Sequence, residues 1–82
     1  MPNPRTIALY ILAELKREQM LFQETVVYEI QERFGDDFVY TNKRGNRAIS
    51  LSVLREFRKL TEGKVIWDHK NRFWRQRESD TR

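Results

Sequence analysis

Two β-prone runs near the end of the chain limit most strongly what this sequence can fold into. They span Val65–Trp67 and Phe73–Arg75 and are rich in branched and aromatic residues, which favour strands. Five polar residues separate them, and Asp68 and Asn71 among these favour a turn. The segment therefore predicts a β-hairpin. Because a two-stranded hairpin is marginally stable alone in water, it must pack against the rest of the chain.

The register of this hairpin decides which side chains face the core. If Lys70 and Asn71 form the tip, Trp67 lies opposite Trp74 across the ladder. Both tryptophans then share one side of the hairpin. We expect that side to cover the core, so that the rings act in folding rather than as a stacking platform for a ligand.

Three helical patterns precede the hairpin. The first begins at Asn3, a suitable N-cap. The second runs from about Glu24 to Phe34, and Gly35 is expected to end it in a left-handed conformation. The third starts near Ser50 as its N-cap and ends at Gly63. The residues expected to face the core at helical spacing are Ile7, Ala8, Ile11, Leu12, Leu15, Val26, Val27, Ile30, Phe34, Val53, Leu54, Phe57 and Leu60.

Two segments between the helices have weaker patterns. Met20–Phe22 is a short apolar run that suits a minimal strand. Asp36–Ala48 reads as a loop, with turn residues at Asn42, Gly45 and Asn46. The predicted order is helix, short strand, helix, helix, strand, strand, which is an α+β fold.

The length and composition favour one small domain. The 82 residues are enough for a single core, so we predict one domain over residues 1–82, structured from about 4 to 77, with a frayed tail at 78–82. The chain has no cysteine, which excludes disulfides and favours a reducing cytoplasm. No apolar run approaches the length of a membrane span, and the N-terminus does not resemble a signal peptide.

Charge is distributed unevenly along the chain. Residues 1–42 carry a net charge of −3 and residues 43–82 a net charge of +7, which gives the total of +4. Such polarity predicts that the C-terminal half attracts polyanions. A merely solvated basic surface is the alternative.

The residues offer little catalytic chemistry. His69 is the only histidine, and no second histidine or cysteine can complete a tetrahedral metal site. Asp36 and Asp37 are adjacent, a spacing that rarely converges on one metal. The three glycines form no phosphate-binding loop. We therefore expect a binding module with no cofactor and no metal, rather than an enzyme.

Three stretches, YTNKRGNRAIS, VLREFRKLTEG and VIWDHKNRFWR, together with the element order, resemble the winged helix-turn-helix superfamily. The likeness covers residues 4–77, and within the superfamily the chain is similar to small uncharacterised bacterial proteins. The resemblance implies a three-helix winged helix-turn-helix with a C-terminal β-hairpin wing. It implies double-stranded DNA as the partner and a role in transcriptional regulation.

By this resemblance, the third helix enters the major groove while the wing reaches a neighbouring groove or the backbone. The groove residues would be Ser52, Arg55, Glu56 and Lys59. The wing contacts would be His69, Lys70, Asn71, Arg72 and Arg75. Lys43, Arg44 and Arg47 in the preceding loop would contact phosphates.

Some features favour a protein partner instead. The outer face of the second helix is acidic, and Glu56 and Glu62 dilute the charge of the third. A protein partner would bind the surface of the third helix and the wing, or a patch on the first helix. Leu9 and Ala13 lie opposite the core face of the first helix and could form a homodimer contact. A third alternative is RNA or an acidic membrane bound through the basic hairpin. That hairpin is not an amphipathic membrane helix, and no RNA-specific aromatic motif is present.

Overall fold

The structure is a computed structural model that describes residues 2–76. Its helices are α1 (Pro4–Glu18), α2 (Gln23–Phe34) and α3 (Leu51–Thr61), with one 3-10 turn, η1 (Asp36–Phe38). Its strands are β1 (Met20–Phe22), β2 (Val39–Thr41), β3 (Arg47–Ile49), β4 (Val65–Asp68) and β5 (Phe73–Gln76). The α+β class and the predicted order of helices and strands are confirmed. The predicted frayed tail, residues 78–82, lies outside the described residues, as does Arg77.

A three-stranded antiparallel sheet closes the fold. Its order is β1-β5-β4, so the strand after the first helix pairs with the last strand of the hairpin. Trp67 lies opposite Trp74, and Trp74 lies opposite Leu21. The predicted register of the hairpin is therefore confirmed. Within residues 2–76 no helix is long and apolar enough to cross a membrane.

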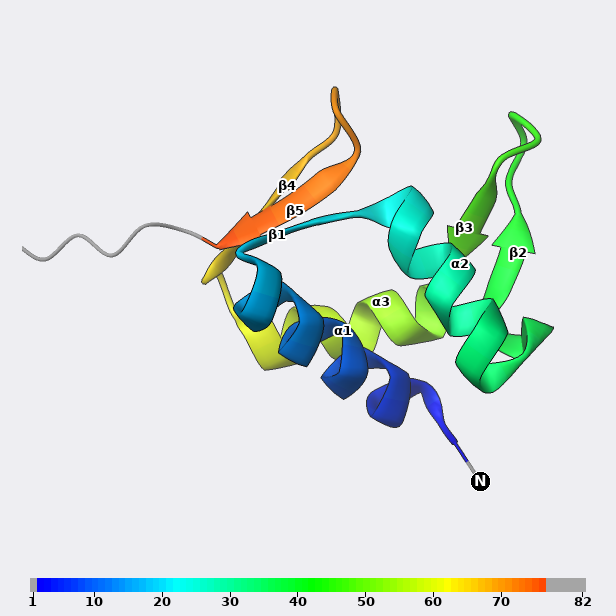
Figure 1. Cartoon of the computed structure of the whole chain (residues 1–82), viewed down its shortest axis with the longest axis horizontal. Helices are drawn as coiled ribbons and strands as arrows, with labels where there is room; N and C mark the ends of the chain where they lie inside the picture. Colours follow the sequence, from blue (N-terminus) through cyan, green and yellow to red (C-terminus); the bar gives the residue numbers. More distant parts are fainter. Residues whose placement is uncertain (1, 77–82) are drawn as a thin grey trace, which may run out of the picture.

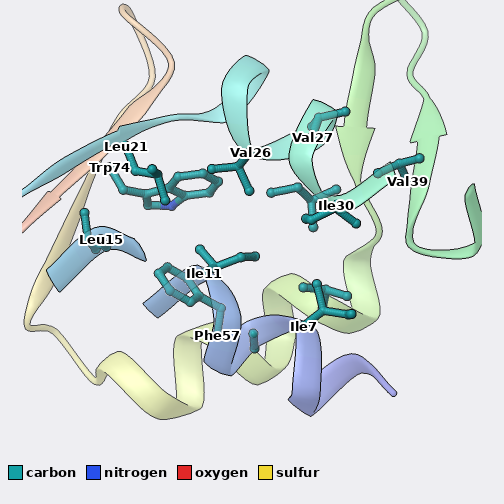
Figure 2. Packing of buried hydrophobic residues seen from close by; sticks show 13 residues of the cluster. Ile7, Ile11, Leu15, Leu21, Val26, Val27, Ile30, Val39, Phe57 and Trp74 are labelled. Carbon is teal, nitrogen blue, oxygen red and sulfur yellow. The ribbon is translucent and has the colours of Figure 1, made fainter. Parts of the chain in front are cut away.

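The core lies between the sheet and α2 on one side and α1 and α3 on the other (Figure 1). Figure 2 shows Trp74 and Leu21 of the sheet facing Ile11 of α1 and Phe57 of α3. Trp74 is 6% exposed, and its ring meets that of Phe57 edge to face with 5.7 Å between centroids. The residues predicted to face the core are all buried or packed against it, with Leu12, Phe34, Leu54 and Leu60 half-buried.

The segment predicted as a loop, Asp36–Ala48, contains regular structure instead. After η1, strands β2 and β3 form a second antiparallel hairpin, in which Val39 pairs with Ile49. The prediction was wrong because each strand has only three residues and, unlike the wholly apolar β1, mixes apolar with polar residues around turn residues, so that no strand signal is visible. Val39 and Ile49 are buried, so the hairpin is held to the domain by its inner residues. Figure 1 shows both hairpins extending in the same direction, with α2 between them.

The helix ends follow the predictions only in part. The side chain of Asn3 caps α1 by accepting a hydrogen bond from the Thr6 amide at 2.9 Å. Ser50 occupies the N-cap of α3, but its hydroxyl makes no capping bond and lies 3.1 Å from the hydroxyl of Ser52. Gly35 has the expected positive φ of 85°, yet its ψ of −169° lies outside the left-handed helical region. α3 ends one residue early, with Glu62 in the left-handed conformation before Gly63.

Trp67 departs from the prediction that both tryptophans are buried. Its ring packs on that of Trp74, with centroids 4.7 Å apart. However, β4 is an edge strand, so one side of Trp67 has no neighbour and 38% of the residue is exposed. Trp74 lies in the central strand and is covered on both sides.

The two tryptophans should therefore differ in their contribution to stability. We expect Trp74→Ala to lower the free energy of unfolding by about 3–5 kcal/mol, because it leaves a cavity in the core. Trp67→Ala should cost about 1–2 kcal/mol, mainly the lost ring contact and part of the buried area. Urea unfolding followed by circular dichroism measures both values. Equal costs would contradict the different burial of the two rings.

Candidate functional site

The exposed strip of α3 carries the residues predicted to read bases. Ser52, Arg55 and Lys59 are exposed, as the spacing predicts. Glu56 is half-buried and already engaged: its carboxylate lies 3.5 Å from Arg5 of α1 and 3.3 Å from Lys59. Glu56 is thus neutralised by its neighbours, and Arg55 is the cation on this strip with no acidic partner among residues 2–76.

A groove between α3 and the β4–β5 hairpin adds a residue that the sequence prediction did not include. The groove has a volume of about 330 Å³, and its walls include Arg58 and Thr61 of α3 and the exposed edge of Trp67. Arg58 is exposed and has no acidic partner within the described part of the chain. Arg58 lines the groove because the β4–β5 hairpin passes beside this part of α3.

The β4–β5 turn, residues 69–72, is held in shape by Asp68. The Asp68 carboxylate accepts hydrogen bonds from the amides of Lys70 at 3.1 Å and Asn71 at 3.0 Å. The bond from the Asn71 amide, supported by one from the Asn71 side chain, holds the pKa of Asp68 below its ordinary value. The turn is therefore ordered from within rather than by contacts with the core.

Arg72 joins this turn to α2. It adopts a left-handed φ of 60°, which is uncommon for a residue with a side chain. Its carbonyl accepts a hydrogen bond of 3.0 Å from the amide of Gln23, the first residue of α2. That bond fixes where the predicted wing stands relative to α2. His69, Lys70 and Asn71 are exposed on the turn, Arg72 is half-buried, and Arg75 is exposed on β5.

The β2–β3 turn presents the predicted loop cations. Asn42 organises it, since its side-chain oxygen accepts hydrogen bonds from the amides of Arg44 and Asn46, both at 3.0 Å. Lys43 and Arg44 are exposed at the tip. Arg47, at the start of β3, lies 3.9 Å from Asp36. These three cations therefore lie on a hydrogen-bonded hairpin rather than on the predicted loop.

A cleft of about 610 Å³ lies over α2 between the two hairpins. One wall comes from Gly45, Asn46 and Arg47 and the other from Asn71 and Arg72. The structure thus brings the predicted loop and wing groups to opposite sides of one cleft. The predicted residues of α3 line neither this cleft nor the groove beside the hairpin.

The electrostatics of the C-terminal part are dominated by unmatched cations. Between residues 43 and 76, only Arg47 and Lys59 form ion pairs with described residues. The cations without an acidic partner in that part of the chain are Lys43, Arg44, Arg55, Arg58, Lys64, Lys70, Arg72 and Arg75. The part of the domain from residue 43 to residue 76 therefore carries an excess of unpaired cations, which suits an anionic partner.

Other candidate sites have less to offer. No three His, Asp or Glu side chains among residues 2–76 are grouped so as to hold a metal ion. Leu9 and Ala13 are exposed on α1, as the helical spacing predicts, but the homodimer contact itself stays a prediction.

Removing the Asp68 carboxylate should loosen the β4–β5 turn. The pKa of Asp68 is lower in the folded state, so its carboxylate stabilises the turn fully above the ordinary aspartate pKa of 3.8. This stabilisation is lost as the pH falls through the lower folded pKa. We expect Asp68→Ala to speed amide exchange at Lys70 and Asn71 at neutral pH. Asp68→Asn is the matched control, since it keeps an acceptor oxygen and should lose only the pH dependence. Unchanged exchange in Asp68→Ala, measured by NMR, would contradict this role.

Comparison with known proteins gives a family but no activity. Residues 3–76 match the model of a family of unknown function, DUF6953. No curated protein and no solved structure shows a significant match to the chain. Since the match extends over α1 to β5, the chain belongs to the DUF6953 family of unknown function.

Proposed function

We propose that this domain is a winged helix-turn-helix that binds double-stranded DNA, with α3 in the major groove and the β4–β5 hairpin as its wing. The observation that carries the proposal is the set of eight cations after residue 42 that have no acidic partner among residues 2–76. Duplex DNA carries about one negative charge per 1.7 Å of its axis, so that such cations gain affinity by releasing counterions.

The order of the elements supports the same proposal. The β4–β5 hairpin follows the three helices, pairs with β1 through β5 and carries a projecting basic turn, which suits the wing of a DNA reader. Arg55 is exposed on α3 and free of ion pairs within the described residues. Arginine can pair bidentately with guanine, so Arg55 would read a base. Arg58 lies on the hairpin side of α3 and would contact the backbone between helix and wing.

The phosphate contacts expected of Lys43 and Arg44 would come from the ordered β2–β3 hairpin rather than from the predicted loop. Lys43 and Arg44 are exposed at its tip, and the Asn42 side chain orders the turn that presents them. A positioned cation contacts phosphate with less loss of conformational freedom than one on a mobile loop. We therefore assign these two residues to the backbone, where they would set the register of the domain on the duplex.

Protein binding is the second candidate function. Leu51 on α3 and Leu9 on α1 are exposed apolar side chains, and such residues suit a protein contact. A contact of that kind would depend weakly on salt, whereas DNA binding weakens steeply as salt rises.

Fluorescence anisotropy with a labelled random-sequence duplex at several salt concentrations tests the DNA proposal. We expect Lys70→Ala to weaken binding to every sequence alike and to lower the salt slope by about one, because one phosphate contact is lost. Arg55→Ala should instead cost about 1–3 kcal/mol on a selected site and relax the preference at one base pair. Lys16→Ala, an exposed lysine on α1, is the matched control and should bind as the parent does. Binding that is absent at low salt, or equally weakened by Lys16→Ala, would overturn the proposal.

A further inference from the structure

The cleft over α2 has two exposed aromatic side chains on its floor that the DNA proposal does not use. Tyr28 of α2 is 64% exposed, and its side chain makes no hydrogen bond or ring contact with residues 2–76. Phe22 is 46% exposed beside it, with its ring held 5.2 Å from that of Phe73. Both rings line the cleft. Two large exposed aromatic side chains in one hollow are typical of a contact surface rather than of solvated structure.

The rims of the cleft are basic and fixed in position. Arg47 projects from the start of β3 and Arg72 from the β4–β5 turn, so one arginine stands on each side. The pair between Arg47 and Asp36 is long, at 3.9 Å, and exposed, so that a bound carboxylate can replace it. The Arg72 backbone is tied to Gln23 of α2. Asn46 and Asn71 add amide side chains on the same two walls. Paired arginines across these aromatic side chains can each bind a carboxylate through two parallel hydrogen bonds.

The floor also carries a negative charge, and this argues against a nucleic acid in the cleft. Glu24 and Gln31 line the floor together with Tyr28. A nucleic acid brings a phosphate at every step along its backbone, so that one of them would approach Glu24. A peptide can instead set a neutral residue over the floor and place carboxylates only at the rims. Glu24 can then accept a hydrogen bond from a peptide amide.

We propose that the cleft between the β2–β3 and β4–β5 hairpins binds an acidic segment of a partner protein. An aliphatic or aromatic side chain of that segment packs on Tyr28 and Phe22, and carboxylates on either side of it pair with Arg47 and Arg72. The cleft volume of about 610 Å³ falls within the range of about 300–1,000 Å³ usual for binding sites. Recognition of acidic motifs by arginines is an established mode of peptide binding.

The test starts from a random twelve-residue peptide library displayed on phage and selected on the full chain. Selected clones should carry acidic residues on both sides of an apolar one. A labelled synthetic peptide of the most enriched clone is then titrated with the parent and with variants. Tyr28→Ala should weaken its binding about tenfold or more, and Arg47→Glu should abolish it. Tyr40→Ala is the matched control, since Tyr40 is exposed on β2 but does not line the cleft, and should leave binding unchanged.

Measuring both DNA binding and peptide binding of the same variants separates this proposal from the DNA proposal. Arg55→Glu should abolish duplex binding and leave peptide binding intact, because Arg55 does not line the cleft, whereas Tyr28→Ala should do the reverse. Selection of no acidic clones, or a peptide that binds Tyr28→Ala as well as the parent, would overturn the peptide site alone. Binding of a labelled single-stranded dT12 that Tyr28→Ala removes would assign the cleft to nucleic acid and also overturn it.

Discussion

The packing of Trp74 is the interaction on which the rest of the structure depends. Its strand, β5, pairs with β1 on one side and β4 on the other, so that it connects the first third of the chain with the last. Its ring meets Phe57 of α3 and the exposed Trp67. An 82-residue chain buries only about 60% of its unfolded surface, and few contacts can compensate for losing this one. The packing of Trp74 therefore holds the β4–β5 hairpin against α3.

A second constraint, hydrogen bonding within the two hairpin turns, orders the surface around the core. The hairpin turns are ordered by their own side chains, Asp68 in one and Asn42 in the other. Cations on these turns are therefore presented in fixed positions without being buried. Because acidic residues concentrate before residue 43, α2 keeps an acidic outer face while the two turns beside it are basic. The surface charge therefore changes from negative on α2 to positive on the adjacent turns. Such a surface suits two different partners better than a uniformly charged surface would.

Sequence patterns predicted the larger elements well and the smaller ones poorly. Helical periodicity located α1, α2 and α3, because each is long enough for the period to repeat, and the branched and aromatic residues of β4 and β5 located the hairpin. The β2–β3 hairpin was missed since its three-residue strands mix apolar with polar residues, whereas the equally short β1 is wholly apolar. Arg58 was not assigned, and the cleft that Arg47 and Arg72 share was not foreseen, because both depend on which hairpin lies beside these residues. Burial of Trp67 was overestimated, as strand order within a sheet is not visible in local sequence.

The most direct test of this division of the surface is an NMR titration of the 15N-labelled chain with a random-sequence DNA duplex. If α3 and the wing hold the duplex, the amide signals of Arg55, Arg58 and Lys70 should shift, while those of Leu9 and Ala13 on α1 and Tyr28 on α2 should not. Shifts confined to α1 or α2, or no shifts at low salt, would contradict the assignment of the basic surface to DNA.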